Sequence, residues 1–380
     1  MRPMRSRLAL KVLSLVLAAA LIATMASVSF RHPQGNDFRS FYRGAQAAAS
    51  HRLAGLYSEQ LDPKIPLDLP YIRTPLFALM LTPFTYLSFA PAYCLWIATQ
   101  SAIFLWLLFQ AQSTTKAAAI ACFYPPVLLG IGHGQDCVLY LLILVVSYWL
   151  FRKDRQAAAG LVLGLGLLKF HLFLLWPAGL IVQKRWQALL GFCATGLIIL
   201  GASIAVAGPH GFRDYCAFLL DPRLTKTTPS VEREVGIGAL MEGMGFSSLP
   251  VQILLGLGVG ALALYSLRGR SVEWLFVILP AASLAITPHA LYYDPTMLLL
   301  SLWIAYTLPG RRALHRVALA LASPVIFFAT VLPPPWTVGS ALGILAFLFL
   351  AVASAGKFVS NSNEPAIVGN NPVAPEPSIP

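Results

Sequence analysis

Apolar runs separated by short polar turns follow one another along almost the whole chain, from residue 8 to residue 355. Many of them approach the ~20 residues that a helix needs to cross the hydrocarbon core of a bilayer. Backbone N–H and C=O groups in lipid must find partners within the chain, so such runs are helices, and the period-two alternation of a membrane barrel is absent. The pattern predicts an all-α polytopic membrane protein with roughly 10–13 transmembrane helices.

The expected membrane segments differ in length and regularity. Residues 75–87 form a short run that Pro75 and Pro83 interrupt, which is typical of a re-entrant or interfacial segment. The first run is longer than the apolar part of a usual signal peptide, so we interpret it as an uncleaved anchor with its N-terminus inside. The expected spans are residues 8–28, 90–109, 117–129, 138–151, 157–168, 170–182, 186–207, 251–267, 272–287, 291–308, 313–332 and 336–355.

Two long polar segments interrupt this pattern. Residues 31–74 follow the first span and residues 208–250 follow the span that ends at residue 207, and alternation puts both on the outer side. Residues 357–380 are rich in Pro, Asn and Ser and have too little apolar surface to fold alone, which predicts a disordered cytoplasmic tail. We therefore expect one membrane domain over residues 1–356 with two outer-face loops.

Composition and charge agree with this class of protein. The chain is 57% hydrophobic and 11% charged, which excludes a water-soluble domain. The formal net charge of +12 does not indicate nucleic-acid binding, because no recognition motif accompanies it and the basic residues gather in short turns. Assigning those turns to the cytoplasm leaves most acidic residues outside, so we expect the chemistry on the outer face. The basic clusters are Arg2/Arg5/Arg7/Lys11, Arg152/Lys153/Arg155, Lys184/Arg185, Arg268/Arg270 and Arg311/Arg312/Arg316.

The five cysteines form no C-x-x-C pair and mostly lie inside apolar runs. We expect buried free thiols, with no metal site and no disulfide framework.

The stretch 35–43 directly after the first span differs from nearly all the rest of the chain, because it combines one carboxylate with two arginines and three aromatic residues. Asp37 can take a proton from a hydroxyl nucleophile, and Arg39 and Arg43 can bind an anion. The alternative is that Asn36 or Asp37 simply caps a helix that runs through Ala49. The local sequence favours the cap.

Three further outer junctions carry polar side chains. His133 and Gln135 lie in the turn 132–136 and can hydrogen-bond a sugar or phosphate, although a tight interhelical turn explains the same residues. Lys169 lies between two short helices, where an ammonium either binds a lipid phosphate or snorkels to the interface. His289 follows Thr287 and Pro288 and can bind phosphate or transfer a proton, or serve only as part of a helix break.

Taken together, these landmarks resemble glycosyltransferase family 87. The resemblance runs from Asp37 to Trp186 and returns at residues 287–289. Its short motifs are Asn36-Asp37-Phe38 with Tyr42, Ala45-Ala48-Ala49, Gly55-Leu56-Tyr57, Arg73-Thr74-Pro75-Leu76-Phe77, Gly134-Gln135, Ala159-Gly160, Leu168-Lys169, Lys184-Arg185-Trp186 and Thr287-Pro288-His289. One departure is Phe170, where the resemblance leads us to expect proline.

The resemblance implies a GT-C-type helical bundle that acts as a polyprenol-phosphate-mannose-dependent mannosyltransferase. It implies that Asp37 is the catalytic base of an inverting transfer to a lipid or glycan acceptor. We expect Lys169, His289 and Arg73, in that order, to bind the donor phosphate, with Tyr42 also contacting substrate. Because these cations can supply the positive charge, we expect no metal and no cofactor.

These implications place the protein in the cytoplasmic membrane as a multi-pass chain, with its active side periplasmic or extracellular. The alternative function is a polytopic transporter or lipid-linked-sugar flippase. That alternative predicts a site near the midplane of the bilayer between matching halves. The sequence shows no internal repeat, and the candidate polar groups gather at one face.

Overall fold

The computed structural model describes residues 2–31, 36–64, 70–110, 121–221, 223–224, 234–246, 248–287, 290–328 and 338–356. These residues are almost entirely helical, and the only extended pairing among them is an isolated bridge between Glu234 and Leu291. The helices, with η for a 3-10 helix, are α1 (Arg2–Arg31), α2 (Phe38–Ala49), α3 (Leu53–Leu61), α4 (Pro75–Met80), η2 (Thr82–Tyr86), α5 (Phe89–Gln110), α7 (Pro125–Gly132), α8 (Cys137–Arg152), α9 (Gln156–Gly164), η3 (Leu165–Leu172), α10 (Leu175–Val182), α11 (Trp186–Leu219), α13 (Ile237–Gly243), α14 (Leu249–Ser266), α15 (Val272–Ile286), η5 (Asp294–Met297), α16 (Leu298–Thr307), α17 (Arg312–Ala322), α18 (Pro324–Phe328) and α19 (Gly339–Gly356).

The predicted all-α polytopic membrane class is confirmed. Among the residues described, three helical segments are long and apolar enough to cross a membrane: Phe89–Leu108, Trp186–Leu219 and Leu249–Ser266. Several further apolar helices are shorter, such as α8 with 16 residues. The number of spans stays a prediction.

Some predicted segments have different boundaries in the structure. The expected span 313–332 is divided, because α17 ends at Ala322 and α18 begins at Pro324, where proline cannot continue the preceding helix. The segment 75–87 forms α4 and η2, each with proline in its first turn. The tail 357–380 lies outside the described residues.

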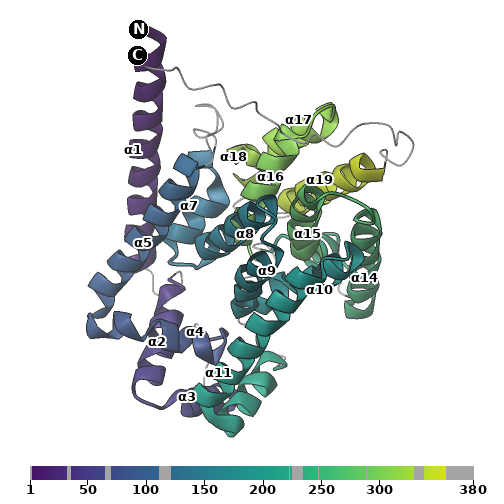
Figure 1. Ribbon diagram of the computed structural model, residues 1–380. Coiled ribbons are helices and arrows are strands. Elements are labelled where there is room, and N and C mark those ends of the chain that lie inside the picture. Colours follow the sequence, from purple (N-terminus) through teal and green to yellow (C-terminus); the bar gives the residue numbers. More distant parts are fainter. Residues whose placement is uncertain are drawn as a thin grey trace, which may run out of the picture.

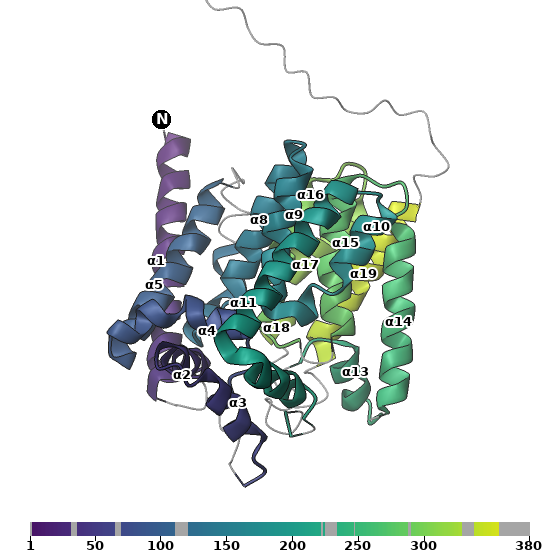
Figure 2. The same ribbon diagram turned by 60° about the horizontal axis from the view of Figure 1, so that its bottom comes forward.

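Two packed parts make up the molecule (Figures 1 and 2). The larger part is a bundle in which α8, α9, α15, α16 and α19 lie between α1 and α5 on one side and α14 on the other. The smaller part lies at one end of this bundle and consists of α2, α3, α4 and the end of α11. Each part has its own cluster of buried apolar side chains. We call the end that carries α2 and α3 the site end.

The two predicted outer loops meet in the smaller part. Helix α11 continues past the predicted boundary at residue 207, but it breaks there, because Gly208 has φ +71° and Pro209 starts a new helical segment. On that second segment, Asp214 accepts a hydrogen bond of 2.7 Å from Ser58 of α3. The guanidinium of Arg223 donates to two carbonyl oxygens at the end of α3. The described parts of both loops therefore pack against each other at the site end.

Residues 234–246 connect the smaller part back to the bundle. The N–H of Val235 donates to the carbonyl of Ala290 at 2.8 Å, beside the bridge between Glu234 and Leu291. The second outer loop therefore returns to the junction between α15 and α16, next to Asp294.

The basic turns lie together at the opposite end of the bundle. Arg152 at the end of α8 forms an ion pair of 3.1 Å with Glu273 of α15, and Gln183 donates to the carbonyl of Ser271 at 3.2 Å. Helices α9 and α11 are in close contact at this end. The contact requires glycine at position 160, because a Cβ there would lie 1.9 Å from a backbone oxygen of α11. The site end and the basic end are therefore opposite faces of one bundle.

Candidate functional site

The turn between α7 and α8 is held on one side by α5. The hydroxyl of Tyr93 donates to the carbonyl of Gly132 at 2.6 Å, and Trp96 Nε1 donates to the carbonyl of Gly134 at 2.9 Å. These bonds satisfy carbonyls at the end of a helix that would otherwise lack partners. The turn is therefore rigid, and it presents its remaining groups to α2.

On its other side, the same turn receives the start of α2. The N–H of Asp37 donates to the carbonyl of His133 at 3.0 Å. Gly134 has φ +74°, and a Cβ there would lie 2.7 Å from Cβ of Phe38. Only glycine combines this backbone conformation with so close an approach. The turn 132–136 therefore docks Asp37, which explains the glycine at 134. A Cβ on Gly132 would instead lie 2.6 Å from Cβ of Met25 in α1.

A buried ion pair lies directly behind this turn. Arg73 donates from Nε to Asp136 Oδ2 and from Nη2 to Asp136 Oδ1, both at 2.9 Å. Tyr140 adds a third bond, with its hydroxyl 3.2 Å from Asp136 Oδ2. The side chains of Arg73 and Asp136 are 5% and 0% exposed. This is the two-pronged geometry in which guanidinium and carboxylate bind most strongly.

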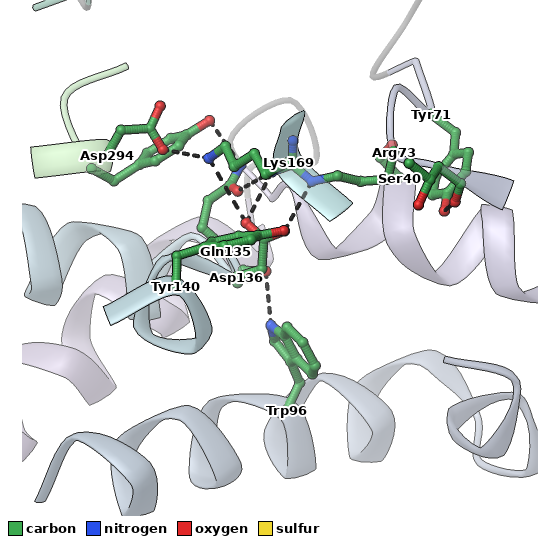
Figure 3. Close-up of polar contacts among 12 residues, drawn as sticks. Ser40, Tyr71, Arg73, Trp96, Gln135, Asp136, Tyr140, Lys169 and Asp294 are labelled. Atoms are coloured by element: carbon green, nitrogen blue, oxygen red, sulfur yellow. Dashed lines mark hydrogen bonds and ion pairs between the residues drawn. The ribbon is translucent and has the colours of Figure 1, made fainter. Parts of the chain in front are cut away.

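A second buried ion pair adjoins the first. Lys169 lies in η3 at a residue with non-helical backbone angles, and its Nζ contacts Asp294 Oδ1. The same Nζ is 3.9 Å from Asp136 Oδ1. Asp294 Oδ2 accepts the N–H of Leu291 at 2.9 Å. Figure 3 shows Lys169 between the two carboxylates, with Arg73 approaching Asp136 from the other side.

Gln135 connects these charges to Asp37. Its Oε1 accepts from Arg73 Nη2 at 3.3 Å, and its Nε2 donates to the hydroxyl of Tyr293 at 2.8 Å. The Gln135 amide also lies near enough to the carboxylate of Asp37 to lower its pKa. With only 4% of its surface exposed, Gln135 is used inside the protein rather than directed at solvent.

Asp37 itself occupies the N-cap position of α2 and is only partly buried. The predicted helix to Ala49 is present, but the Asp37 side chain makes no capping hydrogen bond. Burial raises the pKa of Asp37 above its usual 3.8, while the hydrogen bond from Gln135 and the positive charges of His133, Arg73 and Lys169 partly offset the rise. A carboxylate with a raised pKa is a stronger base than an ordinary surface aspartate.

Arg39 and Tyr42 lie farther along α2 and pack on Phe89. The guanidinium of Arg39 is 4.4 Å from the centre of the Phe89 ring, and its Nε is buried without a hydrogen-bond partner. The hydroxyl of Tyr42 donates to the carbonyl of Leu87 at 2.7 Å. Tyr42 therefore ties α2 to the start of α5, whereas the Nε donor of Arg39 has no hydrogen-bond partner among the described residues.

Two candidate histidines, His133 and His289, belong to neighbouring junctions. The ring of His133 lies edge-on to Tyr292, with ring centres 6.0 Å apart. His289 lies outside the described residues, but its neighbour Thr287 donates to the carbonyl of His171 at 3.1 Å. The junction that carries His289 therefore begins beside η3, two residues from Lys169.

The sequence pattern brought Asp37, Arg73, His133, Gln135 and Lys169 forward as separate candidates, and the structure brings them together. It did not indicate that Asp136 and Asp294 are the counter-ions of the two cations. The sequence did offer one signal for this pairing: the junctions carry two cations and two carboxylates next to apolar helices, where charges need partners.

The described residues contain no cluster of metal ligands and no disulfide. No group of three or more His, Cys, Asp or Glu side chains there lies close enough to hold a metal ion. All five cysteines are free: two are buried, and Cys94, Cys193 and Cys216 are exposed, which differs from the burial expected of them. In a membrane bundle such exposed positions face lipid as readily as water.

Comparison with known proteins extends this picture. The family model described as Glycosyltransferase family 87 matches residues 71–288, which is more than half of the chain. The match includes Arg73, Gln135, Asp136 and Lys169, whereas Asp37 lies before it. No curated protein and no solved structure matches the chain. The chain belongs to glycosyltransferase family 87 and is a membrane glycosyltransferase.

Proposed function

We propose that the protein transfers a hexose, with mannose as the first candidate, from a polyprenyl-phosphate sugar to a lipid or glycan acceptor, and that Asp37 is the general base. One observation carries the assignment of Asp37. Asp136 and Asp294 are paired with buried cations, whereas Asp37 has no ion pair among the described residues and stays partly exposed. Of these three carboxylates it alone can accept a proton from an incoming hydroxyl without breaking an ion pair.

In the proposed reaction the acceptor hydroxyl attacks the anomeric carbon of the donor sugar while Asp37 takes its proton. The bond between that carbon and the phosphate oxygen breaks, and polyprenyl phosphate leaves with the bonding electrons. Attack opposite the leaving group inverts the anomeric centre. One carboxylate suffices, because a phosphate leaving group needs no protonation, in contrast to the carboxylate pair of glycoside hydrolysis.

The departing phosphate needs hydrogen-bond donors or positive charge. Lys169 and Arg73 were our first and third candidates, but each is already neutralised by a buried carboxylate. Arg39 has a buried Nε donor without a partner and lies two residues from Asp37 on the same helix. We therefore place Arg39 first, followed by His289, whose junction begins beside η3. Nothing in this scheme requires a metal ion or cofactor.

We place the reaction at the outer face of the cytoplasmic membrane. The basic turns at Arg152 and Lys184 lie at the end of the bundle opposite Asp37, and short basic turns face the cytoplasm. A lipid-linked donor can then enter from the bilayer with its phosphate at the level of α2. The transporter alternative is less well supported, because the clustered polar groups lie at one end of the bundle.

The test is transfer by the purified protein in lipid. We would supply polyprenyl-phosphate mannose and then other hexoses, with membrane lipid extract as acceptor, and measure release of polyprenyl phosphate and the configuration of the product. Wild type is compared with Asp37→Asn and with Glu59→Gln, which removes an exposed carboxylate from the same outer loop. We expect turnover with wild type and Glu59→Gln, and its loss in a folded Asp37→Asn.

Two results would overturn the proposal. Equal turnover in Asp37→Asn and wild type would remove Asp37 from the chemistry. Movement of the lipid-linked sugar across the bilayer without transfer from any donor would favour the flippase.

A further inference from the structure

The four charges of Arg73, Asp136, Lys169 and Asp294 form one buried cluster whose formal charges cancel. None of the four side chains is more than 5% exposed. They come from four separate segments: the loop before α4, the turn between α7 and α8, the 3-10 helix η3, and the start of η5. Burying ions is costly unless each is paired and hydrogen-bonded, and this cluster meets both conditions.

The surroundings of Lys169 argue against a role as a phosphate ligand. Its ammonium contacts Asp294, lies 3.9 Å from Asp136, and is within 5.7 Å and 5.3 Å of the ring centres of Tyr140 and Tyr293. A phosphate approaching this ammonium would meet two carboxylates that repel it. Arg73 is enclosed in the same way, because its guanidinium donates to Asp136 and Gln135.

We propose that Asp136 and Asp294 are positioning residues, which hold Arg73 and Lys169 in a neutral support for Gln135 and thereby fix Gln135 against the carboxylate of Asp37. This inference rests on the proposed role of Asp37 as the base. It reassigns Lys169 and Arg73 from substrate binding to positioning, and it adds two carboxylates to the machinery of the site.

The hydrogen bonds explain how the support acts. Arg73 Nη2 donates both to Asp136 Oδ1 and to Gln135 Oε1. Because Oε1 is committed to Arg73, the amide presents its Nε2 donor toward the hydroxyl of Tyr293. The same turn receives Asp37, whose N–H donates to the carbonyl of His133 at 3.0 Å, so Gln135 is fixed beside the start of α2. An amide donor fixed in this turn is placed to orient the Asp37 carboxylate for proton transfer. The pair of Lys169 and Asp294 closes the cluster on its other side and prevents Asp136 from turning away from Arg73.

Variants that break or preserve charge balance separate positioning from phosphate binding. Lys169→Met leaves Asp294 without its cation, whereas Lys169→Met with Asp294→Asn removes one charge of each sign and keeps an acceptor for the N–H of Leu291. For wild type, both single variants and the double variant, we would measure the midpoint of thermal unfolding without substrate, kcat and donor KM, and turnover against pH.

We expect Lys169→Met to unfold at lower temperature and to lose kcat with little change in donor KM, because no ground-state contact to the donor is removed. We also expect the acid limb of its pH profile to move to higher pH, since Asp37 gains an unbalanced negative charge nearby. The double variant should recover the unfolding midpoint, the position of the acid limb and most of kcat.

Two results would overturn the inference. A donor KM raised above that of wild type both in Lys169→Met and in a double variant as stable as wild type would show that Lys169 binds the donor itself. A double variant no more stable than Lys169→Met would show that the cluster is not held by charge balance. Asp37→Asn in the same assays tests the proposed base separately, because the unfolding midpoints of the cluster variants do not depend on catalysis.

Discussion

Removing Asp136 should destabilise the protein strongly, because Arg73 is left as a buried charge without a partner. In Asp136→Leu the guanidinium loses two hydrogen bonds of 2.9 Å at a position that is 5% exposed. Breaking one side of a buried ion pair costs about 3–5 kcal/mol. The hydroxyl of Tyr140 also loses its acceptor, which adds about 1 kcal/mol. The unfolding equilibrium should therefore shift by roughly a thousandfold or more.

Removing both charges should cost far less. Arg73→Met with Asp136→Leu replaces the pair by apolar side chains of similar size, a change that is often neutral or stabilising for buried pairs. We expect the double variant to lie within about 2 kcal/mol of wild type, the remainder coming from the lost partners of Gln135 and Tyr140. A large loss of unfolding free energy in the single variant and a small loss in the double variant would show that the two charges are buried and depend on each other.

The assay is reversible unfolding in mixed micelles, followed by circular dichroism as the denaturing detergent is increased. The matched control is the pair of Arg152 and Glu273 at the basic end, joined at 3.1 Å but with Arg152 59% exposed. Breaking that pair with Glu273→Gln should cost no more than about 1 kcal/mol. If Asp136→Leu cost no more than Glu273→Gln, the charges at the site would be hydrated, and the reasoning about a sealed cluster would be wrong.

Three further predictions concern close contacts and protonation. Gly160→Ala should lower the unfolding midpoint, because its Cβ would lie 1.9 Å from a backbone oxygen of α11, whereas Gly258→Ala in α14 meets nothing within 4 Å and should be neutral or slightly stabilising in a thermal melt. Gly134→Ala should reduce turnover and stability together, since alanine is strained at φ +74°; a fully active variant would contradict the docking of α2 on this turn. The pKa of Asp37 is raised above 3.8, so turnover should fall as pH drops through a midpoint above that value. By the same sign, Asp37 contributes stability at low pH that is lost as pH rises through its raised pKa, so Asp37→Asn should be at least as stable as wild type at neutral pH, and a lower midpoint would refute this.

The helical class was predictable because long apolar runs in a bilayer must satisfy their own backbone hydrogen bonds, and helices do so. The sequence located α2 and the break at Gly208 for local reasons: a polar residue opens the one, and a Gly-Pro pair marks the other. Helix lengths were harder to predict. The run 157–182 looks like two adjoining spans, but Lys169 leaves helical geometry in a 3-10 segment so that its ammonium reaches Asp294.

The ion pairs could not be predicted, because each joins residues far apart in the chain. Arg73 and Asp136 are 63 residues apart and Lys169 and Asp294 are 125 apart, so the pairing depends on how the helix ends meet. Sequence reasoning identified Lys169 as unusual because of its place between apolar helices, and the resemblance brought Arg73 forward. It then assigned them to substrate, since the carboxylates were interpreted only as members of an acidic outer face.

The carboxylates of the site that are in ion pairs and the one that is not are suited to different roles. A general base must change its protonation state in every turnover, and a carboxylate in a buried ion pair cannot do so without leaving its cation uncompensated. Asp136 and Asp294 are therefore suited to hold geometry and unsuited to accept protons. Asp37 has the opposite properties, because it is partly exposed, is free of an ion pair among the described residues, and is held through Gln135 by a cluster without net charge. In the proposed reaction Asp37 loses its negative charge when it takes the proton, and the departing phosphate gains negative charge. Since the cluster is neutral, groups such as Arg39 must balance that charge. Under the proposed function we therefore expect the donor phosphate and the acceptor proton to meet on the exposed side of α2.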